Sequence, residues 1–324
     1  MSAIALRDAR QGSQAWLDAR QMGIGSSDAP IIAGESPYQS ALELWAAKSG
    51  LVPREEPDAA TARLFRIGHL MEPLLLQLYT EETGRKTRRE PRMLRHRQRP
   101  WMTASLDARV LGERRIVECK WTHARRWSSP DEPVPGDVQA QVQHAMEVAG
   151  ADVADVVALV AQTLRIVEVP RDPDFIASLV SLETEFWGHV QSGIPPKTDG
   201  SESARKTLAR LHPVDDGTYL PATPDLVELV DLYRAAKLTA KTATASEEGI
   251  ANALRAVIAD AAGIEGLCTL RKSADSTRTN WPAVASAYRD LVTGHPEAVL
   301  DAIQSLHSET RRGPRPLLLS KEKA

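Results

Sequence analysis

Two short stretches, Thr103-Ala-Ser-Leu-Asp107 and Ile116-Val-Glu-Cys-Lys120, decide the fold that we expect for this chain. The surrounding residues 101–110 and 115–121 have the composition of β-strands. The residues between them, Leu111-Gly-Glu-Arg114, are typical of a turn. We therefore predict a β-hairpin at this point of the chain.

The predicted hairpin gathers charged side chains. Alternate side chains of a strand share a face, so Glu118 and Lys120 point to one side while Val117 and Cys119 point to the other. Asp107 lies across the hairpin. Carboxylate oxygens bind Mg²⁺, which keeps waters that can act as nucleophiles, and a nearby lysine can orient or deprotonate such a water. The pattern favours a metal-dependent nuclease; the alternative is a surface strand with an ordinary Glu and Lys.

Further segments of the chain occur in an order that resembles a known family. They are Trp16-Leu-Asp-Ala-Arg20, Gly23-Ile-Gly-Ser-Ser27-Asp28, Ser36-Pro-Tyr-Gln-Ser40, Gly68-His-Leu-Met-Glu72-Pro73, Val138-Gln-Ala-Gln-Val-Gln143-His144 and Gly193-Ile-Pro-Pro196. Each is weak alone, but the ordered set resembles the YqaJ-like phage recombinases, relatives of phage lambda exonuclease within the PD-(D/E)XK nuclease superfamily. Leu106 stands where the superfamily name has Pro, which supplies no metal ligand.

The resemblance implies a fold and a domain organisation. Residues 1–200 are expected to form an α/β, restriction-endonuclease-like core, with a mixed central sheet flanked by helices. A polar linker at 197–206 ends this domain, and residues 201–324 are expected to be a helical accessory region with a mobile basic tail. Within it, residues 224–262 predict one long helix or a helical hairpin bent near 242–248, followed by a small hairpin at 267–280 and a helix at 281–306.

The resemblance also implies a metal site. Glu72, Asp107, Glu118 and the carbonyl of Cys119 would bind one or two Mg²⁺ ions, with Mn²⁺ as the alternative. Lys120 and Gln143 would position the attacking water. Glu72 falls on a predicted amphipathic helix over 60–82, where Gly68 one turn earlier leaves space for a metal or phosphate. Gln143 falls on a predicted helix over 138–149, where solubility is the alternative reason for a glutamine.

A second predicted site lies near the start of the chain. Ser26 or Ser27 can cap a short helix over 28–33, whose free N–H groups attract anions. Arg20 comes shortly before it, so Arg20 and Ser27 are expected to hold a terminal DNA phosphate. An ordinary helix cap with a surface arginine is the alternative.

Composition restricts the remaining choices. The net charge is only −3, so DNA must be bound through local patches such as the basic run at 85–99, which otherwise is a solvated face. Two cysteines are too few for a disulfide framework or an iron–sulfur cluster and suit a reducing compartment. No signal-peptide core or membrane-length apolar stretch is found, so a cytoplasmic enzyme with no membrane partner is expected.

The function implied by the resemblance is metal-dependent exonuclease action on the ends of linear double-stranded DNA. It further implies processive 5′-to-3′ degradation, a ring-shaped homotrimer and a single-strand annealing protein as partner in phage-type recombination. Two alternatives stay open. One is a structure- or sequence-specific PD-(D/E)XK endonuclease, which would cut circular DNA, and the other is a non-catalytic scaffold that binds DNA ends.

Overall fold

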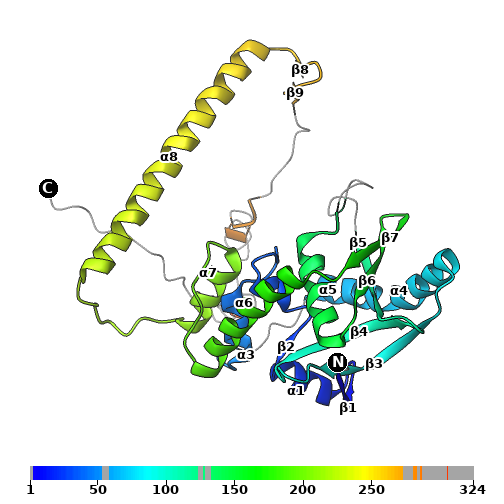
Figure 1. The fold of residues 1–324 in the computed structure, drawn as a ribbon. Helices are drawn as coiled ribbons and strands as arrows, with labels where there is room; N and C mark the ends of the chain where they lie inside the picture. The colour runs from blue at the N-terminus through cyan, green and yellow to red at the C-terminus, as the bar shows by residue number, and fades with distance from the viewer. Residues whose placement is uncertain are drawn as a thin grey trace, which may run out of the picture. The chain divides into compact units, whose positions relative to one another are not determined.

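The chain forms two compact units, Met1–Pro213 and Val214–Ala324. The computed structural model describes residues 3–52, 58–122, 127, 133–272, 280–282, 285–286 and 305, and the ribbon of Figure 1 follows them. Each unit is described by itself.

The first unit is built on a mixed sheet. Within the described residues it has seven strands in the order β1-β3-β4-β5-β6-β7, with β2 paired to β4. The β5–β6 and β2–β4 pairs are parallel and the other pairs are antiparallel. The predicted mixed sheet is confirmed. The strands are β1 (Ile4–Arg10), β2 (Ile24–Gly25), β3 (Thr87–Arg95), β4 (Met102–Val110), β5 (Arg115–Thr122), β6 (Val153–Val160) and β7 (Thr163–Pro170).

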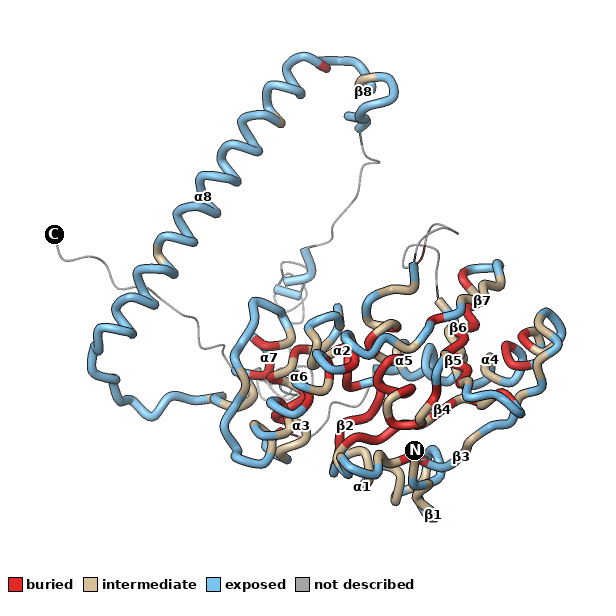
Figure 2. The backbone as a smooth tube through the Cα atoms, in the orientation of Figure 1, coloured by how far each residue is buried: buried red, intermediate tan, exposed pale blue. Residues whose placement is uncertain are grey.

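Helices cover both faces of this sheet (Figure 1). On one face, Leu75 and Tyr79 of α4 (Ala59–Thr83) belong to a buried cluster with Val117 of β5. On the other face, Val142 of α5 (Gly136–Ala149) belongs to a cluster with Ile116. Figure 2 shows buried residues concentrated in β4, β5, β6 and α5. Val117 and Ile116 thus turn to opposite faces, as strand alternation requires. The remaining helices of this unit are α1 (Gln14–Gln21), α2 (Ala29–Ile32), α3 (Ala41–Lys48), α6 (Pro173–Ser192) and α7 (Glu202–Leu211).

The predicted hairpin is confirmed as β4 and β5. Its turn contains Gly112 at φ 83°, a left-handed conformation that glycine adopts without steric cost. The assigned register pairs Ala108 with Val117 and Arg109 with Ile116. Beyond Ala108 a side chain replaces the main chain as hydrogen-bond partner across the hairpin. The Asp107 Oδ2 accepts a hydrogen bond of 2.8 Å from the Cys119 N–H. The two strands therefore part where the acidic residues lie.

The domain boundary differs from the one predicted at residue 200. Helix α7 still belongs to the first unit, because it packs on α3. The Ser203 hydroxyl donates to the Glu43 carboxylate at 2.5 Å, and Ala204 is buried in one cluster with Trp45. The polar linker was a poor boundary signal, since a short amphipathic helix after it still had an apolar face to bury.

The second unit consists mainly of α8 (Pro224–Ile258), followed by β8 (Gly263–Ile264) and β9 (Cys268–Thr269). Helix α8 is continuous, so of the two alternatives the single long helix is confirmed and the hairpin bent near 242–248 is not. The small hairpin begins earlier than predicted, and residues 273–279 of that prediction lie outside the described residues. The same holds for most of the helix predicted at 281–306 and for the tail from residue 311. Among the described residues, no helix has the length and apolar character needed to cross a bilayer.

Candidate active site

Three acidic residues converge where β4 and β5 part. Asp107 comes from β4, Glu118 from β5 and Glu72 from the middle of α4. Burial, followed by the negative charge of Glu118, raises the pKa of Asp107 well above its usual value, and Glu72 adds to the effect. Burial also raises the pKa of Glu72, against the opposing influence of His69 and Arg89. The site therefore concentrates negative charge in a poorly solvated place.

A lysine and an amide complete this cluster. The Lys120 ammonium donates to Glu118 Oε1 at 2.8 Å and to Gln141 Oε1 at 2.8 Å. The Gln141 amide donates to the same Glu118 oxygen at 2.7 Å. Glu118 is buried, so both donors offset the cost of holding its charge away from water.

The glutamine expected at the site, Gln143, is not there. Its side chain is fully buried, donates to the Pro170 carbonyl at 2.9 Å and accepts from the Asp172 N–H at 3.0 Å. Side chains two positions apart on a helix point in directions that differ by about 200°, so Gln141 and Gln143 cannot both face β5. The sequence held a signal for the right choice. The apolar seam of this helix consists of Val138, Val142, Ala145 and Ala149 and faces the sheet; Gln141 lies about 70° from its centre and Gln143 about 130°.

Glu72 lies beside open space, as we predicted from the glycine at position 68. Apart from the chain neighbours of Gly68 and the backbone of its own helix, no heavy atom of the described residues lies within 4 Å of the position that a Cβ on Gly68 would take. Glu72 itself pairs with Arg89 of β3 at 3.0 Å. The neighbouring His69 turns its Nδ1 to the Phe65 carbonyl at 2.7 Å, a contact within its own helix. His69 nevertheless lies close enough to Glu72 to oppose the rise of the pKa of that carboxyl.

The donor set fits a hard divalent cation. Mg²⁺ prefers oxygen ligands such as carboxylates, and its positive charge would offset the repulsion between these acidic side chains. Burial and the nearby carboxylates raise the pKa of the Cys119 thiol, which leaves its main-chain carbonyl as the donor suited to Mg²⁺. In the part of the chain that the structure describes, no three His, Cys, Asp or Glu side chains are already arranged as a metal site. The acidic side chains contact Arg89, Lys120 and the Cys119 N–H instead.

The two residues expected to bind a phosphate do lie together. Arg20 Nη2 donates to Ser27 Oγ at 3.0 Å, and its guanidinium carbon lies 4.8 Å from the centre of the Trp16 ring. The Trp16 indole donates to Ser105 Oγ at 2.9 Å, and Ser105 is two residues before Asp107 on β4. Trp16 thereby connects the Arg20–Ser27 pair to the strand that carries the acidic cluster.

The predicted cap of this segment is wrong. Neither Ser26 nor Ser27 caps a helix; α2 is a single turn that follows Asp28. The Asp28 carboxylate turns back to accept from the Gly25 N–H at 2.9 Å and pairs with the buried Lys48 ammonium at 2.8 Å. Asp28 therefore braces the loop that holds Ser27.

Acidic side chains balance the positive charge of four of the eight basic residues in the run at 85–99. Four of its arginines form ion pairs: Arg85 with Glu113 and Asp155, Arg89 with Glu72, Arg92 with Glu90, and Arg99 with Glu147. Lys86 and Arg88 are exposed. The capacity of the run to bind phosphate thus depends on a few residues and not on all eight.

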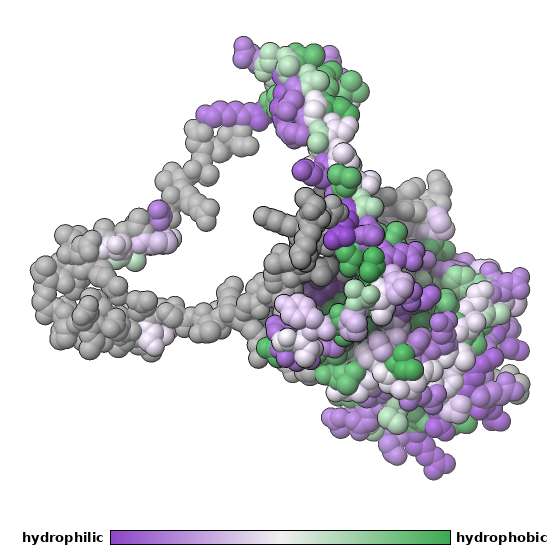
Figure 3. Space-filling view, turned by 90° about the vertical axis from the view of Figure 1, so that its left-hand side faces the viewer, coloured by the Kyte–Doolittle hydropathy of each residue, from purple (hydrophilic) through white to green (hydrophobic). Residues whose placement is uncertain are grey.

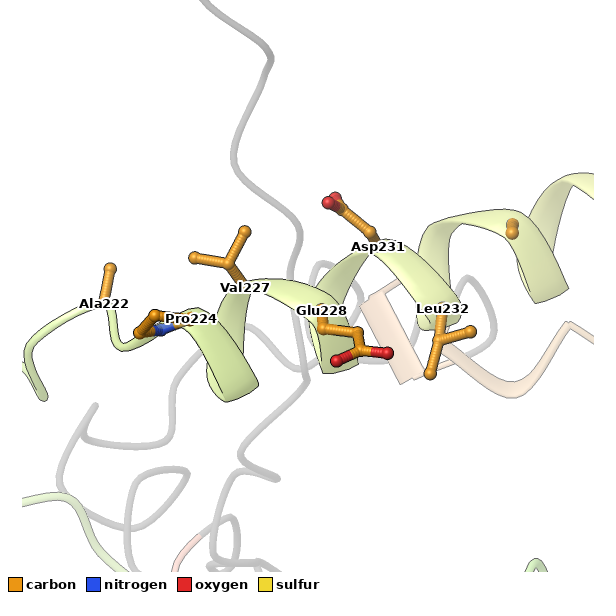
Figure 4. Close-up of a pocket in the computed structure, with 7 residues that line it drawn as sticks. Ala222, Pro224, Val227, Glu228, Asp231 and Leu232 are labelled. Carbon is orange, nitrogen blue, oxygen red and sulfur yellow. The ribbon is translucent and has the colours of Figure 1, made fainter.

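A hollow in the second unit does not contribute to this site. It lies beside the first turns of α8, as Figure 4 shows, and none of the candidate residues line it. Among the described residues its lining consists of Ala222, Pro224, Val227, Glu228, Asp231, Leu232 and Ala235.

The fold and the site together define an α/β protein with an acidic cluster and a lysine at a splayed β-hairpin. Residues 15–152 match the model of the YqaJ-like viral recombinase domain. The chain is also 32% identical to YqaJ of Bacillus subtilis (strain 168) over 216 residues, which are 64% of this chain and 66% of that protein. The match spans slightly less than two thirds of that relative's length. Residues 15–152 thus match a YqaJ-like viral recombinase domain and the chain is homologous to YqaJ, so the predicted resemblance to the YqaJ-like recombinases is confirmed.

Solved structures of exonucleases also match part of this chain. An alkaline exonuclease from Laribacter hongkongensis is 18% identical and covers 61% of this chain and 100% of its own, with a TM-score of 0.45. A phage-related exonuclease from Haemophilus somnus 129PT is 15% identical and covers 53% of this chain and 96% of its own, with a TM-score of 0.38.

Proposed function

We propose that this protein is a metal-dependent deoxyribonuclease that degrades linear duplex DNA from its ends. The observation that carries the proposal is the convergence of Asp107, Glu118 and Glu72 with Lys120 at the place where β4 and β5 separate. The YqaJ-like viral recombinase domain supports a role in DNA recombination. We place the enzyme in the cytoplasm.

The metal would be held by oxygen donors of this chain. Glu72, Asp107, Glu118 and the Cys119 carbonyl would bind Mg²⁺, or Mn²⁺ in its place. A bound divalent cation activates water and stabilises negative charge on the phosphate and the leaving oxygen. Glu72 pairs with Arg89 through Oε2 only, and an Arg89 released from this pair would be free to contact the DNA backbone.

The protein groups around the metal would orient the nucleophile. Lys120 holds an ammonium beside Glu118, from which it can donate to an attacking water or to a phosphate oxygen. Gln141, in place of Gln143, holds the Glu118 carboxylate in position through its amide. A neutral amide can do so without competing with the acids for the cation.

End recognition would depend on Arg20 and Ser27. A terminal 5′ phosphate is a strong acceptor, and each of its charge-assisted bonds is worth about 1.5–3 kcal/mol. Because Trp16 connects these residues to β4, a phosphate held by Arg20 would direct the adjoining strand toward Asp107. This arrangement favours 5′-to-3′ polarity. The family resemblance adds processivity, a homotrimer and an annealing partner to the proposal.

End-labelled linear duplex, with and without a 5′ phosphate, tests the proposal. The wild type should degrade it with Mg²⁺ and be silent in EDTA, while Asp107→Ala and Glu118→Ala should abolish cleavage in folded protein. Glu113→Ala, a change of an exposed acid in the same hairpin, is the matched control and should cleave normally. Near-normal Mg²⁺-dependent activity in either active-site variant would contradict the metal site.

The same assay separates the alternatives. Arg20→Ala should slow digestion of phosphorylated ends by roughly tenfold to a hundredfold and of hydroxyl ends little. Arg114→Ala removes an exposed arginine paired with Asp152 and is the control. Cleavage of closed circular duplex as fast as linear would favour the endonuclease. Tight binding of ends without turnover in Mg²⁺ or Mn²⁺ would favour the scaffold.

A further inference from the structure

Helix α8 exposes an apolar stripe along its whole length. It has 35 residues, and Ile258 at its end is the one buried residue among them. Leu226, Leu229, Ile250, Leu254 and Val257 are between 39% and 78% exposed. Figure 3 shows hydrophobic side chains at the surface of the upper part of this helix. Because most of the stability of a helix in a protein comes from packing an apolar face, α8 needs a partner.

The stripe has the spacing of a coiled coil. Apolar residues recur at alternating intervals of three and four, as in the a and d positions of heptads. Only Glu247 interrupts the series. The seam consists of Leu226, Leu229, Tyr233, Ala236, Ala240, Ala243, Glu247, Ile250, Leu254 and Val257.

This seam is complementary to itself when the helix is reversed. With a two-fold axis between Lys241 and Thr242, every a position lies opposite a d position of the second helix. Large residues then meet at both ends: Leu226 faces Val257, Leu229 faces Leu254, and Tyr233 faces Ile250. At the centre Ala240 faces Ala243, which lets the helices approach closely. A parallel pair would instead bring Glu247 against its own copy.

The charges along α8 support the same direction. Their order from the start of the helix is acidic, basic, acidic and basic, formed by Asp225, Glu228 and Asp231, then Arg234, Lys237 and Lys241, then Glu247 and Glu248, and finally Arg255. Reversal about the same axis brings Glu228 level with Arg255 and Arg234 within one residue of the level of Glu248. A parallel, in-register pair would bring like charges level, which is unfavourable.

We propose that α8 is an association helix that pairs in antiparallel direction with α8 of a second copy of this chain. The pairing buries the exposed seam at both ends and places opposite charges at the same height. It does not depend on the proposed nuclease activity.

Cysteine cross-linking of the full chain tests the register and the direction. In a Cys268→Ser background, which removes the exposed native cysteine, Leu229→Cys protein is mixed with Leu254→Cys protein and oxidised. The expected main product is the mixed disulfide between the two variants. Leu238→Cys, on the outer side of the helix, replaces either partner as the control and should give little product.

Other products would overturn the proposal. A Leu229→Cys disulfide with its own copy, in preference to the mixed one, would show a parallel pair. Absence of any intermolecular disulfide would show that another occupant, such as residues 281–306 of the same chain, covers the seam. In sedimentation, Leu254→Glu should raise the dissociation constant by at least about tenfold, since it buries an unpaired charge, while Leu238→Glu should not. Equal behaviour of these two variants would also overturn it.

Discussion

Replacing Gln141 and Gln143 separately provides the sharpest test of the site. The two residues lie two positions apart on α5, have the same side chain and make two hydrogen bonds each, but only those of Gln141 reach Glu118 and Lys120. Gln141→Ala should therefore lower cleavage and leave stability nearly unchanged. Gln143→Ala should lower stability and leave cleavage by the folded protein nearly unchanged.

The expected magnitudes follow from the contacts. Loss of a partner that orients a metal-binding carboxylate typically costs a factor of roughly 10–100 in activity or metal affinity. Gln143 makes two hydrogen bonds to the main chain, each with a net value of about 0.5–1.5 kcal/mol, so Gln143→Ala should cost about 1–3 kcal/mol. For a unit of this size, such a loss lowers the unfolding midpoint by about 2–12 °C.

Two measurements on the same preparations decide the outcome. Single-turnover cleavage of phosphorylated linear duplex reports the function per folded molecule, and thermal unfolding in EDTA reports the stability. The reasoning would be refuted if Gln143→Ala removed cleavage at a temperature where it is folded, or if Gln141→Ala cleaved like the wild type.

Three other variants test the charges of the first unit. In EDTA, Asp107→Asn should raise the unfolding midpoint at neutral pH while removing cleavage, because burial and Glu118 raise the pKa of this carboxyl and its charged form destabilises the fold; a lowered midpoint would contradict this. Neutralising Lys86 and Arg88 should reduce the salt dependence of DNA binding by roughly 0.9 per lost phosphate contact, and an unchanged slope would make the basic run a solvated face. Burial alone would lower the pKa of His144, but the charge and hydrogen bond of Glu183 raise it above 6.5. The His144–Glu183 pair thus contributes its full stabilising free energy below pH 6.5 and loses it as the pH rises through the raised pKa of His144. Urea unfolding should show this loss in the wild type but not in His144→Gln.

The hairpin and the helices of the first unit could be predicted from the sequence because their signals are local. Side-chain alternation placed Glu118 and Lys120 on one side of a strand, and the turn at Gly112 brought Asp107 across from them. The cap at Ser40 was also predictable, since its hydroxyl accepts from the Glu43 N–H at 3.2 Å within four residues. Spacing along the chain is sufficient for each of these features.

Predictions failed where a side chain finds its partner in a segment that is distant in the sequence. Asp28 precedes α2 without capping it, because its carboxylate accepts from the Gly25 N–H and pairs with the buried ammonium of Lys48. The boundary at 200 failed because Ser203 finds its partner in Glu43, far away in the sequence. The continuous course of α8 was one of two alternatives, and periodicity alone did not distinguish them.

The sequence by itself predicted the hairpin of β4 and β5 and the helices α4 and α5, since strand alternation and apolar periodicity need no knowledge of contacts. The order of motifs led to the mixed sheet and to Glu72, Asp107 and Glu118 as candidate metal ligands. Only the tertiary structure decided that the Asp107 carboxylate takes the place of a main-chain partner for Cys119, and that the Gln141 amide reaches Glu118. The reason is physical. The direction of a side chain follows from its own backbone, whereas the group that it meets depends on where the sheet and helices pack in space.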